Sequence, residues 1–105
     1  MDPTLLEAFE RLIAVARQDT GQGKRVAAFI LAWWNAGANG GFDLSDLFAL
    51  DASTCEDLIT VFSVLARSPR AIYPDDYEQE IHALAARWRP RTGRGRRRQD
   101  ASLRN

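Results

Sequence analysis

Apolar residues recur at intervals of three and four along most of the chain, which is the spacing of one face of an α-helix. The pattern predicts a first helix over residues 3–19, with Asp2 as its N-cap and Pro3 at the first helical position. After a glycine-rich break at residues 21–23, a second helix is predicted over residues 24–36. Its apolar residues leave no polar stripe, so we expect it to be the central helix, surrounded by the others.

The Asn- and Gly-rich residues 35–41 are expected to end the second helix, because these residue types tolerate positive φ. A short helix over residues 44–50 is predicted next. Asp43 is its expected N-cap, and Phe42 and Leu47 have the spacing of a hydrophobic staple.

A fourth helix is predicted to begin between residues 51 and 54 and to reach about Arg67, where Ser68 and Pro69 stop it. Its spacing indicates a broad core face. The residues of that face are Leu58, Ile59, Val61, Phe62 and Leu65.

The last predicted helix begins after Asp75, its expected cap, with Glu78 at the third helical position. Its apolar stripe is Tyr77, Ile81, Leu84, Ala85 and Trp88. The predicted fold class is therefore all-α: a compact bundle of about five helices around a central apolar helix. We expect residues 1–90 to form this domain and residues 91–105 to form an Arg-rich, flexible tail, because the tail has too few apolar residues to build a core.

The formal net charge of zero hides a strong asymmetry. Residues 1–86 carry six Lys or Arg against thirteen Asp or Glu, a net charge of −7. Residues 87–105 carry eight Arg and one Asp, a net charge of +7. The sequence thus predicts an acidic body with a cationic C-terminal segment.

Composition also bears on location. The single cysteine, Cys55, excludes an internal disulfide, and the acidic start lacks the basic and apolar regions of a secretory signal. The longest apolar run, residues 26–34, is about half of the roughly 20 residues that a membrane-spanning helix needs. We expect a cytoplasmic protein that does not enter a membrane.

No catalytic, cofactor or metal site is indicated. Residues 20–24 contain a Gly-Gln-Gly-Lys sequence but lack the earlier glycine and the hydroxyl residue of a phosphate-binding loop, and a helix precedes them. The aspartates within residues 43–51 lack the alternation of a calcium loop and are better explained as helix caps. Cys55 and His82 would act as a dyad only if two helices brought them together. We therefore predict a protein that is not an enzyme.

Two features could contact a partner. Trp33 and Trp34 point about 100° apart on a helix. Either one lies in the core and the other is partly covered, or one of them, with Phe42 or Phe48, forms an exposed aromatic anchor for a protein partner. The candidate anchors are Trp34, Phe42 and Phe48. The sequence does not indicate an oligomeric state.

The Arg-rich tail is the second feature, since a polycation binds phosphate backbones through counterion release. It has no pattern for reading bases, so such binding would be non-specific. The tail could instead fold back on the acidic residues 75–80 or serve only solubility. The candidate nucleic-acid contacts are Arg91, Arg94, Arg96, Arg97 and Arg98.

The motif Trp-Trp-Asn-Ala-Gly at residues 33–37, with Gly-Gly-Phe-Asp-Leu at residues 40–44 and Arg-Trp-Arg-Pro at residues 87–90, resembles an uncharacterised family of short bacterial proteins. The resemblance implies an association with integrative conjugative elements and plasmids of proteobacteria. It implies no catalytic or binding residue, and the family's sequences end soon after the last motif, so the tail is not a family feature.

These observations favour the interpretation that the chain is a small, non-enzymatic accessory protein of a bacterial mobile genetic element. It would bind a protein partner and modulate a host or defence factor. The alternative is an accessory protein that binds nucleic acid non-specifically through its tail.

Overall fold

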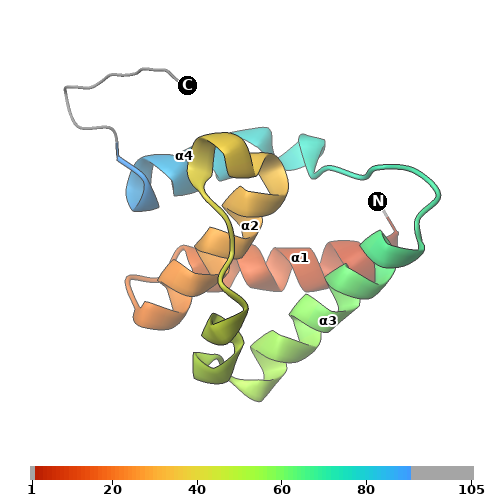
Figure 1. Cartoon of the computed structure of the whole chain (residues 1–105), viewed down its shortest axis with the longest axis horizontal. Helices are drawn as coiled ribbons and strands as arrows, with labels where there is room; N and C mark the ends of the chain where they lie inside the picture. Colours follow the sequence, from red (N-terminus) through yellow and green to blue (C-terminus); the bar gives the residue numbers. More distant parts are fainter. Residues whose placement is uncertain (1, 91–105) are drawn as a thin grey trace.

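The computed structural model describes residues 2–90, and the tail at residues 91–105 lies outside them (Figure 1). All regular structure in the described part is helical, which confirms the predicted all-α bundle. The elements in order are α1 (Pro3–Ala16), α2 (Gly21–Asn39), the 3-10 helix η1 (Leu44–Ala49), α3 (Ala52–Arg67), the 3-10 helix η2 (Asp75–Tyr77) and α4 (Glu78–Trp88).

The helices pack in a chain of neighbours. α1 lies against both α2 and α3, and α2 lies against both α1 and α4 (Figure 1). The second helix, predicted to be the central one, shares that position with α1. α1 shares the centre because one whole face of it is buried, from Leu5 to Ala16.

The core is made of apolar side chains from all four α-helices, as the amphipathic spacing predicts. α2 contributes six consecutive buried residues, so it is covered on more than one side. The core residues are Leu5, Ala8, Phe9, Leu12, Ile13, Ala16, Val26, Ala27, Phe29, Ile30, Leu31, Leu58, Val61, Ile81 and Leu84.

Two indole groups tie distant segments to this core. Trp33 Nε1 donates to the Ile72 carbonyl oxygen over 2.8 Å, which holds the long connection between α3 and η2 against α2. Trp88 Nε1 donates to the Ala16 carbonyl oxygen over 2.8 Å, which holds the end of α4 against the end of α1. Each tryptophan thus buries apolar surface while its N–H is satisfied.

The beginnings of the first two helices were only partly predicted. Asp2 caps α1 as expected, because its carboxylate accepts a 2.7 Å bond from the Thr4 N–H. α2 begins at Gly21 rather than at residue 24, since the Thr20 hydroxyl accepts from the Gly23 N–H and caps it. The glycines therefore lie in the helix, and only residues 17–20 form the turn.

Two later expectations were also wrong. Asp75 does not cap the last helix: it starts η2, and α4 follows from Glu78 without a side-chain cap. Ile59 and Phe62 do not belong to the buried face of α3, because α3 packs chiefly against α1 and that contact covers only the side of Leu58 and Val61.

Candidate partner-binding face

Most of the exposed large apolar side chains come from two adjacent elements. Leu44 and Phe48 of η1 are 67% and 93% exposed. Ile59 and Phe62 of α3 are 53% and 37% exposed. We call these four residues the η1–α3 face. Within residues 2–90 the remaining exposed side chain of this kind is Tyr73, in the connection between α3 and η2.

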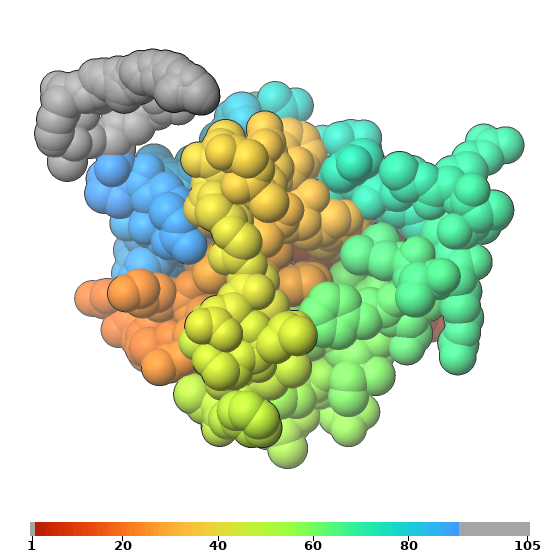
Figure 2. All heavy atoms as spheres, in the orientation of Figure 1, coloured from red at the N-terminus to blue at the C-terminus, as the bar shows by residue number. Residues whose placement is uncertain are grey.

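The exposed flank of α3 is the one that is turned toward η1. Cys55, Ile59 and Phe62 lie within about 60° of one another around the helix axis, at 100° per residue. Cys55 marks the direction of η1, because its Sγ lies 3.6 Å from the Leu47 carbonyl oxygen. The end of η1 therefore lies against the beginning of α3, and the two elements are neighbours on one surface of the molecule (Figure 2).

Aromatic rings in edge-to-face contact lie beneath the face. Phe29, a buried residue of α2, meets Phe62 edge to face with ring centroids 5.2 Å apart. It meets Phe42 in the same way at 5.7 Å. Phe42 is therefore half-buried against the core, whereas Phe48 is almost fully exposed.

Polar contacts fix η1 to the beginning of α2. The Arg25 guanidinium lies 3.5 Å from the Asp46 carboxylate. The Gln22 side chain accepts from the Asp51 N–H over 2.6 Å and donates to the Asp51 carboxylate over 3.2 Å. Asp43 caps η1 as predicted, and its hydrogen bonds from Ser45 lower the pKa of its carboxyl group. These aspartates thus have structural partners.

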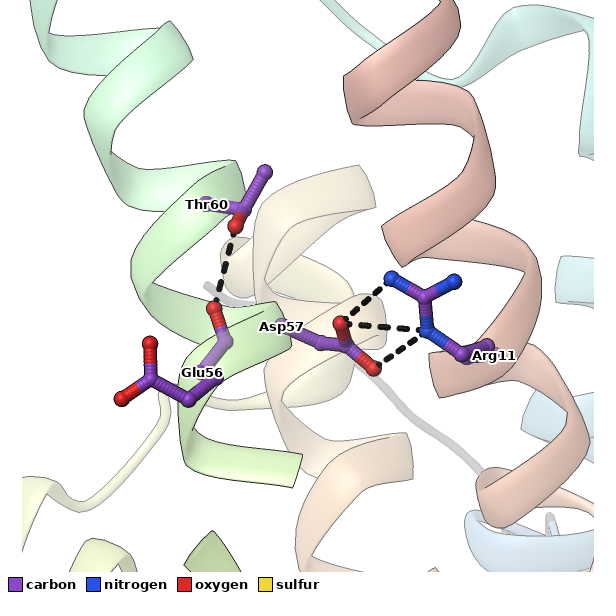
Figure 3. A network of polar contacts seen from close by, with 4 residues as sticks. All are labelled: Arg11, Glu56, Asp57 and Thr60. Atoms are coloured by element: carbon purple, nitrogen blue, oxygen red, sulfur yellow. Dashed lines mark hydrogen bonds and ion pairs between the residues drawn. The ribbon is translucent and has the colours of Figure 1, made fainter. Parts of the chain in front are cut away.

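A bidentate ion pair fixes α3 to α1 (Figure 3). Arg11 Nη2 and Nε donate to the Asp57 carboxylate over 2.8 and 3.0 Å. The hydrogen bond to Asp57, more than its charge, raises the pKa of Arg11. Glu56 points away from this pair in Figure 3. This contact and the buried side chains together join α3 to α1.

The structure does not bring Trp34 to the η1–α3 face. Trp34 lies edge to face with the His82 ring of α4, at 6.3 Å. Trp33 instead lies on the side of Phe29, whose ring centroid is 6.3 Å away. Both tryptophans are half-buried. Of the three predicted anchors, Phe42 and Phe48 flank one surface and Trp34 lies on another.

The polar part of the tryptophan motif has a structural role. Asn35 leaves the helical conformation, and its Oδ1 accepts from the Ala38 N–H over 3.1 Å, so it caps a short final turn. The Asn39 side chain donates to the Leu31 carbonyl oxygen at 3.3 Å. Arg89 Nε donates to the Asn39 carbonyl oxygen at 2.9 Å, which ties this turn to the end of α4.

The cysteine and the histidine that could form a catalytic dyad lie apart from each other. Cys55 lies beside η1, whereas His82 contacts Trp34 and lies 3.8 Å from Glu78. No set of three or more His, Cys, Asp or Glu side chains within residues 2–90 is arranged to hold a metal ion. The described helices also include none that combines the length and the apolar character needed to cross a membrane.

Tyr77 borders a shallow hollow between α1 and α4. Its hydroxyl donates to Glu10 over 2.7 Å. This bond, with smaller contributions from burial and from Glu80, raises the pKa of Tyr77 to about 12. The phenol is protonated at neutral pH, and its hydrogen bond joins η2 to α1.

The model of one protein family matches residues 6–89 of the chain. The chain belongs to DUF7673, a family of unknown function. The match includes the tryptophan motif and the whole η1–α3 face, and residues 91–105 lie beyond it. No curated protein and no solved structure is significantly similar to the chain.

Sequence reasoning missed Leu44, Ile59 and Phe62 as members of a surface. The last two were assigned to the core face of their helix. The width of that face could have revealed them. It has five apolar residues within eight positions, and one neighbouring helix cannot cover so broad a face, so some of these residues must be exposed.

Proposed function

We propose that this member of DUF7673 is a small non-enzymatic interaction protein that binds a protein partner through the η1–α3 face. The observation that carries the proposal is the gathering of Leu44, Phe48, Ile59 and Phe62 on adjacent elements, all of them exposed. Contiguous apolar patches on a small domain are typical of interaction sites, and aromatic residues dominate binding hot spots.

The rigidity of the face supports the same function. Phe62 rests on Phe29, and ion pairs or hydrogen bonds fix the flanking elements to α1 and α2. A preorganised apolar surface loses little conformational entropy on binding. Such a surface is suited to docking a partner.

We further propose that the protein acts in the bacterial cytoplasm as an accessory factor of a mobile genetic element. The support is the resemblance carried by residues 33–37 and 40–44, together with the single cysteine. In this setting the partner would be a host or defence factor.

A second candidate function is non-specific binding of nucleic acid. The observation that favours it is the charge of residues 87–105, where eight arginines stand against one aspartate. Two of these arginines already have partners in the described part: Arg89 binds the Asn39 carbonyl, and Arg87 lies 3.7 Å from Asp19. The remaining six would supply the phosphate contacts.

The main proposal is tested by affinity purification from the native host with the full chain and two variants. The double variant Phe48→Ser with Ile59→Ser removes exposed apolar groups, so we expect recovery of the partner to fall at least about tenfold. Tyr73→Ser is the matched control, because Tyr73 is 52% exposed but lies outside the η1–α3 face. It should leave recovery unchanged.

Circular dichroism must show that the double variant keeps its helical content and melting temperature. If the double variant recovers the partner as well as the wild type does, the assignment of this face is refuted. Loss of the partner in the Tyr73 variant alone would move the interaction to the connection between α3 and η2.

A further inference from the structure

The chain segment that builds the η1–α3 face carries charges of one sign only. Residues 26–66, which build most of α2 and all of η1 and α3 except its last residue, contain five Asp or Glu and no Lys or Arg. The cations that reach these acids come from outside the segment. They are Arg25, next to Asp46, and Arg11, next to Asp57.

Three of the five acids lack a cationic partner within residues 2–90, and one of them, Asp51, is bound instead by the neutral Gln22 side chain. Asp43 and Glu56 are both exposed and take part in none of the ion pairs there. Each borders an exposed apolar side chain: Asp43 precedes Leu44, and Glu56 lies one helical turn before Ile59. The apolar face therefore has an acidic rim in which these two carboxylates are not neutralised by a cation.

We propose that the η1–α3 face binds a basic amphipathic helix of the partner protein, with the apolar stripe of that helix on Phe48, Ile59 and Phe62. This inference rests on the proposed function and specifies the chemistry of the partner. Lys or Arg side chains beside the stripe would meet Asp43 and Glu56. Charge complementarity of this kind raises association rates and selects against acidic competitors.

Other occupants fit these observations less well. A second copy of the chain would place one acidic rim against another, which like-charge repulsion opposes. An extended peptide gains affinity by adding a strand to a sheet edge, and residues 2–90 contain no strand. A helix satisfies its own backbone groups and can lie along the exposed flank of α3.

The experiment measures binding of fluorescent 18-residue peptides to the full chain by anisotropy. The first peptide places Leu on one helical face and Lys elsewhere. The second has the same composition in scrambled order, and the third has Glu in place of Lys. We expect the first to bind at least about tenfold more tightly than either control, and to weaken as salt increases.

Variants of the protein test where the peptide binds. Phe48→Ser with Ile59→Ser should weaken the first peptide at least about tenfold, while Tyr73→Ser should not. Asp43→Lys with Glu56→Lys should shift the preference toward the Glu peptide. Circular dichroism and melting curves show that each variant is folded.

Three results would overturn the inference. Equal binding of the scrambled Lys peptide would mean that charge alone acts. Equal binding of the Glu peptide would mean that the acidic rim has no effect. A dimer in sedimentation that Phe48→Ser disperses would assign the face to a second copy.

The outcomes separate this inference from the proposed function. If recovery of the host partner depends on Phe48 and Ile59 but the peptides show no preference, the interaction function stands and the basic helix is wrong. If neither the partner nor any peptide responds to these substitutions, both proposals fail.

Discussion

Gly40 and Gly41 stand next to each other in the connection between α2 and η1, yet only Gly40 requires glycine. Its φ of 90° and ψ of 166° lie in a region that is essentially restricted to glycine. Gly41 does not have a positive φ. A Cβ at either position would meet no atom within 4 Å, so the two residues differ in backbone conformation and not in available space.

We predict that Gly40→Ala lowers the free energy of unfolding by about 1–3 kcal/mol, because the new side chain is strained at this φ and ψ. Gly41→Ala should change it by less than about 1 kcal/mol, and any change should be stabilising. Urea denaturation of both variants is the measurement. Equal effects at the two positions would mean that this connection has a different backbone.

At the level of elements, the corner between α1 and α2 depends on close backbone contact at Gly23. A Cβ there would overlap the Gln18 carbonyl oxygen and lie 2.8 Å from the Val15 carbonyl oxygen. At Gly21 the nearest atom would be Nη1 of Arg25, at 3.0 Å, which belongs to a side chain that can move. The two helices therefore approach as closely as they do because residue 23 has no side chain.

Gly23→Ala should destabilise the protein by about 1–3 kcal/mol, since overpacking against fixed backbone outweighs the higher helix propensity of alanine. Gly21→Ala has the same propensity gain without the clash, so it should be neutral or slightly stabilising. Thermal denaturation compares the two. A Gly23 variant with a higher melting temperature than the wild type would contradict the observed packing of α1 and α2.

At the level of the whole molecule, the charge asymmetry separates two modes of binding. The surface formed by residues 26–66 has no Lys or Arg and would repel phosphates. Six arginines lie in residues 91–105, outside the η1–α3 face and outside the family match. Protein binding by the body and nucleic-acid binding by the tail can therefore be tested independently.

If the tail binds duplex DNA, the affinity should not depend on sequence, and its log-log slope against salt should be roughly −4 to −5 for about four to six phosphate contacts. Removal of residues 91–105 should abolish the gel shift and leave the melting temperature unchanged. A truncated chain that still shifts DNA would place the site in the acidic body and refute this assignment. A salt-dependent loss of stability on truncation would instead support a tail that folds back on the body.

The local features of this fold were predictable from sequence because they depend on residues within a few positions of one another. Asp2 and Asp43 each accept from an N–H two residues ahead, and the stripe of α4 repeats every three or four residues. Helix type, approximate bounds and the all-α class follow from such interactions. The error at the start of α2 arose because Gly21 and Gly23 were interpreted as a break, whereas the Thr20 hydroxyl caps a helix that includes them.

The candidate site was decided by the tertiary structure. Ile59 and Leu58 are neighbours in one apolar run, but only Leu58 faces α1, so one is buried and the other exposed. Trp33 and Trp34 likewise have different neighbours, because Phe29 and Ile72 lie on one side of α2 and α4 on the other. Periodicity indicates which residues would be stable in a core. Whether a neighbouring helix covers them depends on contacts between residues far apart in the chain, and sequence spacing carries no information on those.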